Sequence, residues 1–428
     1  MNAMGLVERA NGGAEHIDRI VVIHDFPRAE GGAGTLACLA ANQFAKRGID
    51  VTFFSGACDQ AGDTQDGIEH VGLHGRALLQ LSRAAAMRQG FQNVEARDAL
   101  RRWISLNDTD RTVYHLHNWS QILSPAIFDA LRPVEHRVVA TCHDFFNVCP
   151  NGGFTNFRKS QPCDLRPMSA ACVTSNCDRR SGLHKAWRVA RHANLLRLAR
   201  FGSSQATFTF IHSRMRDRFV AGGFAAHDTE IVPNPVTPWT DERIEGEKNS
   251  GFLFVGRIGK DKGADLAAQA AQEAGVGLTL AGTGELEQEL GAGNDLIRLA
   301  GWCDPRALRE LASKARALIV PSRVVEPFGL VILEAAASGL PVIVSDRAYL
   351  AEDVLRCGFG EVFDPGKPAQ LHEILVRWLA DDVAVRRMSE AGMTHAANLS
   401  LGPDEWAEQF LEIFGRKLAL ARKLDGVA

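Results

Sequence analysis

Two glutamates stand eight positions apart in a stretch, 325–343, whose pattern predicts a loop, a helix, a turn and a strand. Glu326 lies in the entry loop and Glu334 inside the helix, so both carboxylates are expected near the carboxyl ends of the strands, where they can accept hydrogen bonds from sugar hydroxyls. Pro327 and Gly329 permit a sharp entry into the helix, whose first amide groups can bind an anion. The alternative is a buried helix with two surface glutamates.

Two cations follow an earlier strand, in a glycine-containing loop that opens a helix. The loop holds Arg257 and Lys262, between Gly256 and Gly263. Cations beside a helix N-terminus suit a diphosphate, whose charge needs several donors at once. The glycine pair at 282–284 ends another expected strand, where the backbone can approach a ligand closely. The alternative is a loop of solvated basic residues.

The first half of the chain offers a glycine-rich turn and a histidine. Gly31 and Gly32 follow the first expected strand and open a helix, but the full G-x-G-x-x-G spacing is absent, which disfavours a nicotinamide site. His143 and Asp144 follow the strand expected at 137–141. A histidine there can donate to a phosphate or a sugar hydroxyl, while structural packing remains the alternative interpretation.

The chain has 428 residues, which corresponds to two or three domains. Its formal net charge of −3 gives no signature of nucleic-acid binding. No apolar run approaches the roughly 18 residues of a membrane span. Residues 1–19 lack the apolar core of a signal peptide, so we expect a cytoplasmic protein.

Short apolar runs alternate with amphipathic stretches, which predicts an α/β protein with parallel sheets. Three prolines at 233–238 interrupt this rhythm, which then restarts. Two doubly wound domains with a ligand cleft between them are therefore expected. The strands are predicted at 19–24, 50–54, 112–116, 137–141 and 206–211 in the first domain, and at 251–255, 277–281, 296–300, 315–320 and 341–345 in the second.

Four cysteines frame a segment after His143. They stand at Cys149, Cys163, Cys172 and Cys177, without the C-x₂-C spacing of a zinc ribbon. Four thiolates in a loop of low apolar content can still hold a structural zinc ion or an iron–sulfur cluster. Ordinary reduced cysteines are the alternative.

Two basic stretches lie in the first half. The helix expected at 182–200 follows Arg179, and this region contains Arg188 and Arg191 but no acidic residue; a second basic helix is expected at 83–104. Basic amphipathic helices are typical of membrane surfaces or anionic acceptors. The alternative for each is a helix packed on its own sheet.

Taken together, the motifs resemble the family-4 retaining glycosyltransferases of glycosyltransferase group 1, from Gly31-Gly32 to the C-terminal helix. The most specific part is the glutamate pair from Glu326-Pro327-Phe328-Gly329 to Glu334. The resemblance implies the GT-B fold, with two Rossmann-like doubly wound parallel-sheet domains that face a central cleft. The implied parts are an acceptor-binding domain at 17–236 with a cysteine-containing insertion at about 145–180, a nucleotide-sugar-binding domain at 237–402, and a helix at 403–424 that crosses back to the first domain.

The resemblance also implies roles. Arg257 and Lys262 would bind the nucleotide diphosphate, Glu326 the donor sugar and Glu334 the ribose, and His143 would lie near the reacting carbon. His143, Glu326, Arg257 and Lys262 form the catalytic set. The donor-binding set is Gly31, Gly32, Gly256, Gly282, Trp302, Cys303, Phe328, Gly329, Leu330 and Glu334.

The implied activity is transfer of a hexose from a UDP- or GDP-linked donor to a glycan or a polyprenyl-diphosphate-linked acceptor, with no cofactor required for transfer. Surface polysaccharide or glycolipid biosynthesis is the expected process, at the inner face of the cytoplasmic membrane and with peripheral membrane contact. A sugar-nucleotide 2-epimerase of similar fold and a non-catalytic nucleotide-sugar-binding regulator are the alternatives. The residues do not identify the base, the sugar or the acceptor.

Overall fold

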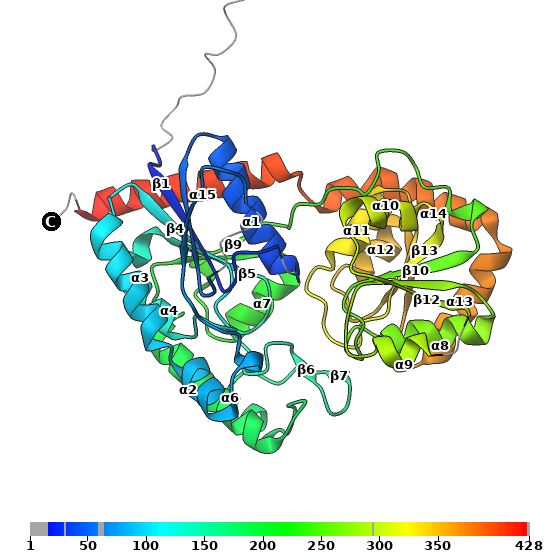
Figure 1. Ribbon diagram of the computed structural model, residues 1–428, viewed down its shortest axis with the longest axis horizontal. Coiled ribbons are helices and arrows are strands. Elements are labelled where there is room, and N and C mark those ends of the chain that lie inside the picture. Colours follow the sequence, from blue (N-terminus) through cyan, green and yellow to red (C-terminus); the bar gives the residue numbers. More distant parts are fainter. Residues whose placement is uncertain (1–15, 30, 59–63, 293–294, 426–428) are drawn as a thin grey trace, which may run out of the picture.

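The structure is a computed structural model that describes residues 16–29, 31–58, 64–292 and 295–425. Two domains lie side by side, and each is built on a parallel sheet flanked by helices (Figure 1). The expected α/β architecture with two doubly wound sheets is confirmed. Most of the segment on which the signal-peptide prediction rests, residues 1–15, lies outside the described residues.

The first sheet contains seven described strands in the order β3-β2-β1-β4-β5-β8-β9. Its inner strands are buried on both faces, as crossover helices require. The strands are β1 (Arg19–His24), β2 (Asp50–Ser55), β3 (Glu69–Gly72), β4 (Thr112–Leu116), β5 (Val138–Cys142), β8 (Thr207–Phe210) and β9 (Thr229–Ile231). The helices are α1 (Gly31–Lys46), α2 (Arg83–Phe91), α3 (Val94–Asn107), α4 (Ala126–Leu131), α5 (Ala170–Thr174), α6 (Gly182–Ala199) and α7 (Ser213–Ala221).

The second sheet contains six described strands in the order β12-β11-β10-β13-β14-β15, and neighbouring strands among them pair in parallel. The strands are β10 (Gly251–Val255), β11 (Leu278–Ala281), β12 (Ile297–Gly301), β13 (Ala315–Val320), β14 (Val342–Ser345) and β15 (Gly360–Phe363). The helices are α8 (Ala264–Ala274), α9 (Glu287–Gly291), α10 (Pro305–Ala312), α11 (Leu330–Ala337), α12 (Ala351–Cys357), α13 (Pro368–Ala380) and α14 (Asp382–His395). Short 3₁₀ helices lie at Leu78–Gln80, Arg132–Arg137, Ala226–Asp228, Gly246–Lys248 and Ala396–Leu399.

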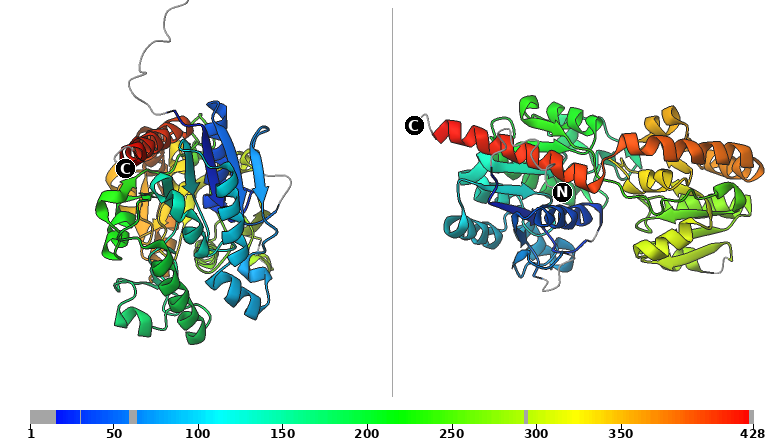
Figure 2. Two further views of the ribbon diagram at one scale, coloured as in Figure 1. Left: turned by 90° about the vertical axis from the view of Figure 1, so that its left-hand side faces the viewer. Right: turned by 90° about the horizontal axis from the view of Figure 1, so that it is seen from above.

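The last helix, α15 (Pro403–Asp425), leaves the second domain and lies along the first, as the view from above in Figure 2 shows. Its apolar stripe buries Trp406, Phe410 and Phe414 in one cluster with Phe44 of α1. The chain passes from the first domain to the second through a linker around residues 233–238, which lies beside the start of α15. There the Val236 amide donates to the Leu401 carbonyl at 2.9 Å. The crossing back to the first domain is therefore confirmed.

One expected helix is wrong. The sequence predicts a single helix over 83–104, whereas the structure breaks it into α2 and α3. Asn93 caps α3 by accepting the Ala96 amide at 3.1 Å, and its own amide donates to the Ser124 hydroxyl at 2.7 Å. Contacts with a distant loop therefore stop α2, and a window of local residues does not contain them.

The segment between β5 and α6 carries the short antiparallel pair β6 (Thr155–Asn156) and β7 (Gln161–Pro162), followed by α5. It projects from the first domain toward the second, as the ribbon shows (Figure 1). Thr155 reaches the second domain directly, because its hydroxyl accepts the Val325 amide at 3.4 Å. The insertion thus forms part of the interdomain boundary.

Candidate active site

The starts of two helices from different domains meet at the boundary. A Cβ placed on Gly32, in the first turn of α1, would lie 3.7 Å from Leu330 Cδ1 at the start of α11. Gly31 and Gly329 precede or open these helices with φ of 68° and 72°, a conformation that favours glycine. Two helix N-termini that converge bring unpaired amide groups and positive dipole ends together, which suits an anion.

Lys262 and Glu326, both predicted as catalytic, form an ion pair at this place. Lys262 Nζ lies 2.5 Å from Glu326 Oε2, and the Ser322 hydroxyl donates to the same oxygen at 3.3 Å. Gly263 positions the lysine, since its φ is 74° and a Cβ there would lie 2.0 Å from the Pro321 carbonyl oxygen. The side chains are 32% and 15% exposed, so a ligand can reach the pair.

Arg257 also has a carboxylate partner. Its guanidinium pairs with Asp261, and Arg179 from the first domain reaches the same carboxylate at 3.5 Å. Burial raises the pKa of Asp261, but the two arginines outweigh it and leave the pKa below its usual range. Asp261 is therefore ionised, and it joins the two domains through one shared ion-pair cluster.

Glu334 lies inside α11, half-buried against the linker. Burial raises the pKa of its carboxyl to about 7, although a hydrogen bond with the Trp239 side chain opposes the shift. Phe328, just before the helix, is buried and anchors the entry loop. The carboxyl of Glu334 is therefore poised to change charge near neutral pH.

Glycines after β10 and β11 and at the end of β12 allow the backbone there to come close to other groups. Gly256 and Gly282 have φ of 145° and 141°, and a Cβ on Gly282 would lie 1.9 Å from the Gly256 carbonyl oxygen. Beyond β12 the indole of Trp302 is 77% exposed, while the Cys303 thiol faces the Gly301 carbonyl at 3.5 Å. These positions can present backbone and one aromatic face to a ligand.

His143 follows β5 on the other side of the boundary. Its Nε2 lies 3.0 Å from His117 Nδ1, and its Nδ1 is buried without a hydrogen-bond partner among the described residues. Two residues on, Phe145 packs edge-on against Tyr349 of the second domain, so the end of β5 faces that domain. Burial raises the pKa of neighbouring Asp144 to about 6.

Two of the four predicted metal ligands lie close to a buried lysine. Cys172 and Cys177 lie on either side of buried Lys185, whose Nζ is 3.9 Å and 3.2 Å from their sulfurs. Within the described residues, no group of three or more His, Cys, Asp or Glu side chains is arranged to hold a metal ion. The structure gives no support to the site at Cys149, Cys163, Cys172 and Cys177, which stays a prediction for elemental analysis to test.

Arg188 and Arg191 do not lie on an exposed basic face. Arg191 is buried and donates to the carbonyls of Gly90 and Ser120 at 2.6 and 2.7 Å. Arg188 pairs with Asp178 at 2.9 Å. These arginines attach α6 to the domain, since composition shows that a helix is basic but not which face packs. None of the described helices is both long and apolar enough to cross a membrane.

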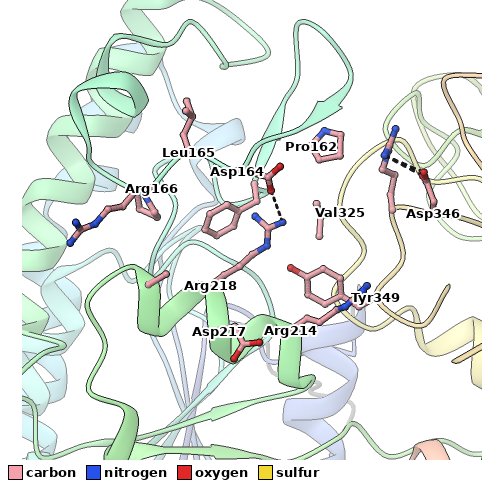
Figure 3. Close-up of a pocket in the computed structure, with 14 residues that line it drawn as sticks. Pro162, Asp164, Leu165, Arg166, Arg214, Asp217, Arg218, Val325, Asp346 and Tyr349 are labelled. Atoms are coloured by element: carbon pink, nitrogen blue, oxygen red, sulfur yellow. Dashed lines mark hydrogen bonds and ion pairs between the residues drawn. The ribbon is translucent and has the colours of Figure 1, made fainter. Parts of the chain in front are cut away.

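A cavity of about 680 Å³ lies between α7, the insertion and the loop after β14 (Figure 3). Arg214 and Arg218 reach it from α7, and Arg347 and Tyr349 from the second domain. Arg218 donates to Asp164 at 3.2 Å and Arg347 to Asp364 at 3.1 Å, whereas Arg166 is exposed on the insertion. The sequence analysis did not identify this cavity, because its walls come from segments distant in the chain.

The architecture defines a class. Two parallel-sheet domains that face each other, with a last helix returning to the first, form the GT-B fold. The structure matches sucrose-phosphate synthase from Thermosynechococcus elongatus with a TM-score of 0.69, 18% identity, and coverage of 96% of this chain and 99% of the other. It matches WaaG, a glycosyltransferase involved in lipopolysaccharide biosynthesis, with a TM-score of 0.64, 17% identity and coverage of 92% and 99%.

The sequence comparisons give the family. The family model "Glycosyltransferase Family 4" matches residues 30–239, and "Glycosyl transferases group 1" matches residues 239–395. The chain belongs to the group 1 glycosyltransferases. A glycogen synthase of Mycobacterium tuberculosis is 34% identical over 151 residues, 33% of this chain and 36% of that one. A D-inositol 3-phosphate glycosyltransferase of Corynebacterium diphtheriae is 30% identical over 185 residues, 38% and 42% of the two chains. The matches thus span less than half of these relatives.

Proposed function

We propose that this glycosyltransferase is a retaining hexosyltransferase that moves a hexose from a UDP- or GDP-linked donor to a hydroxyl of a glycan or lipid-linked acceptor, in surface polysaccharide or glycolipid biosynthesis. The observation that carries the proposal is the Lys262–Glu326 pair beside the start of α11, opposite the start of α1. HepE from Anabaena has been solved in complex with UDP and in complex with UDP-glucose. The UDP complex matches the fold with a TM-score of 0.62 and 16% identity over 94% of this chain and 100% of HepE, and the UDP-glucose complex with 0.61 and 15% over 93% and 99%. This likeness supports a nucleotide sugar as donor.

Donor binding exchanges partners at the two ion pairs. The diphosphate lies between the starts of α1 and α11 and competes with Glu326 for Lys262 and with Asp261 for Arg257. Each cation then moves from a carboxylate to a phosphate, a charge-assisted contact of similar strength. The Glu326 carboxylate released in this way accepts hydrogen bonds from the sugar hydroxyls, and Glu334 accepts them from the ribose.

Transfer breaks the bond between the anomeric carbon and the diphosphate oxygen. The charge that develops on this oxygen is stabilised by Lys262, Arg257 and the amides at the start of α11, which are already in place. The acceptor oxygen forms the new bond on the face that the diphosphate leaves, and its proton passes to the departing phosphate. The configuration is thus retained, and no carboxylate nucleophile is needed.

The interdomain cavity forms the acceptor side of this site. It adjoins Val325, the residue before Glu326, and its volume lies within the range of small-molecule sites. Arg166 on its rim is exposed and can contact an anionic group of the acceptor. We therefore expect Arg166→Ala to raise the KM of an anionic acceptor without changing donor affinity.

We expect membrane contact around α2, which lies in the second of the two basic stretches that the sequence suggested, together with the start of α6. Leu79, Met87 and Leu183 are 73%, 53% and 86% exposed around α2 and the start of α6. Residues 75–94 contain no acidic residue, and Arg83 and Arg88 of α2 are exposed. Exposed apolar side chains among arginines suit an anionic lipid surface. Reversing both charges should abolish flotation with anionic vesicles; unchanged flotation would contradict the contact.

The donor is tested by melting the protein with UDP-, GDP- and ADP-sugars, because a ligand that binds the native state raises the melting temperature. We expect a UDP- or GDP-hexose to raise it and the Lys262→Ala variant to lose the shift. If none of these sugars changes the melting temperature, the proposal fails. Conversion of the donor to an epimer without acceptor would favour the 2-epimerase, and NMR of the product anomer tests retention.

A further inference from the structure

A chain of buried hydrogen bonds ends at His143. His115 and His117 alternate along the end of β4, so they share one face of the sheet. His143 Nε2 lies 3.0 Å from His117 Nδ1, and His117 Nε2 lies 3.2 Å from His115 Nδ1. His115 Nε2 lies 2.8 Å from the Thr141 hydroxyl on β5, to which Thr209 on β8 donates at 2.9 Å.

All three rings are neutral at physiological pH. Burial lowers the pKa of His115 and of His143 to about 3, and that of His117 well below its usual value. The far end is sealed by α15, since Phe410 and Phe414 pack on the His115 ring with centroids 4.5 and 5.4 Å away. A neutral imidazole has one N–H donor and one acceptor nitrogen, so each ring in the chain must point one way.

The hydroxyl at the far end sets that direction. Thr141 Oγ1 accepts the Thr209 proton, which leaves its own proton for His115 Nε2. His115 then carries its hydrogen on Nδ1 and donates it to His117. His117 in turn donates from Nδ1 to His143 Nε2, and the remaining hydrogen of His143 lies on Nδ1.

The opposite direction forms as many hydrogen bonds among the described residues but leaves a different donor unpaired, the Thr141 hydroxyl inside the sheet instead of His143 Nδ1 at the end of β5. His143 would donate from Nε2, His117 from Nε2, and His115 from Nε2 to Thr141. Thr141 would then accept two hydrogen bonds, and its own proton would have no acceptor among the hydrogen bonds of the described residues. An unpaired hydroxyl is costly in a fully buried site, and both threonines are buried.

We propose that the chain Thr209–Thr141–His115–His117 holds His143 in its Nδ1–H tautomer, so that His143 presents one neutral hydrogen-bond donor to the hexose. The atom in question, Nδ1, is the one without a partner among the described residues. The identity of the ligand in this inference rests on the proposed function, whereas the tautomer of His143 does not. His117, His115 and the two threonines are positioning residues, and His143 is the one member of this chain of hydrogen bonds that contacts the sugar.

The tautomer can be measured without any ligand. The full chain is labelled with ¹⁵N-histidine, and long-range ¹H–¹⁵N correlation spectra are compared with those of His143→Gln to assign the ring among the 14 histidines. We expect a protonated Nδ1 and an unprotonated Nε2. A protonated Nε2 would overturn the inference. If Nδ1–H is found but no nucleotide sugar binds, the proposed function fails while the tautomer assignment stands.

Two matched variants test the origin of the direction. Thr141→Val removes the hydroxyl at nearly constant shape, and Thr141→Ser keeps it. We expect Thr141→Val to give mixed tautomers at His143 and to lower kcat with the identified donor by about twofold, with UDP affinity unchanged, since UDP has no hexose. Thr141→Ser should restore both. Thr209→Val is the second variant if Thr141→Val does not fold. An unchanged tautomer and unchanged kcat in the folded variant would contradict the proposal.

Discussion

The two domains prepare their sides of the boundary in different ways. The second domain presents charges in exchangeable pairs, Lys262 with Glu326 and Arg257 with Asp261, all on loops that open helices. The first domain presents His143, which is neutral and held at one nitrogen by a buried ring. Charged side chains near a surface can change partner when an anion binds. A buried chain of hydrogen bonds instead fixes which nitrogen of His143 carries the hydrogen. The difference separates affinity for the diphosphate from orientation of the sugar.

The largest effect should come from the charged side. We expect Lys262→Ala to lower kcat by about 100- to 1,000-fold, because one preorganised donor to the leaving group is lost. Lys260→Ala is the matched control, since this neighbouring lysine is exposed. Steady-state kinetics with the identified donor measures both. A loss below about threefold for Lys262→Ala would remove the lysine from the site.

A change of pH should alter the affinity of the second domain for the nucleotide sugar. Burial raises the pKa of Glu334 to about 7, so the carboxyl is mostly protonated at pH 6 and mostly ionised at pH 8. An ionised carboxylate accepts ribose hydroxyls more strongly, so the affinity for the nucleotide sugar should rise by up to about tenfold between these values. Calorimetry measures it. Glu334→Gln should flatten the profile; an equal rise in that variant would assign the titration to another group.

The neutral side should give a smaller effect of a different kind. We expect His143→Ala to lower kcat by about fivefold, equivalent to a hydrogen bond of about 1 kcal/mol, with UDP affinity unchanged. His74→Ala, at an exposed histidine in the same domain, is the control. If UDP affinity falls together with kcat, His143 acts on the diphosphate and the contrast between the two sides is wrong.

The smallest effect is expected where the two sides meet. Arg179→Ala removes an interdomain ion pair whose arginine side chain is 47% exposed, and such pairs contribute little. We expect kcat/KM to change by less than about twofold, with the difference vanishing in high salt. A change above tenfold would show that the pair controls how the domains meet.

The sequence predicted the strand framework well because buried parallel strands are continuous apolar runs. The expected strands at 19–24, 112–116, 251–255 and 315–320 have these bounds in the structure. The edge strands β3 and β9 were not predicted. Their residues, such as Glu69–Gly72, are exposed or half-buried and carry little apolar signal.

The sequence predicted the site residues that belong to a recognisable local motif. It did not predict those whose role depends on partners from distant segments. The pairing of Lys262 with Glu326 brings together two motifs that the sequence had already singled out. His115 and His117 were missed, although their alternate spacing at a strand end was a readable signal, because their partners, Thr141 and His143, lie on or just after β5. The burial of Arg191 was missed for the same reason, since its partners are backbone carbonyls of other segments.

The central claim is that a sugar-linked diphosphate lies between the starts of α1 and α11 and takes Lys262 from Glu326. A crystal structure of the full chain with the nucleotide sugar that raises the melting temperature most tests it directly. We predict phosphate oxygens within hydrogen-bond distance of Lys262 Nζ and of the first amides of α11, with the Lys262–Glu326 pair opened. An intact pair, with the diphosphate bound elsewhere, would contradict the account.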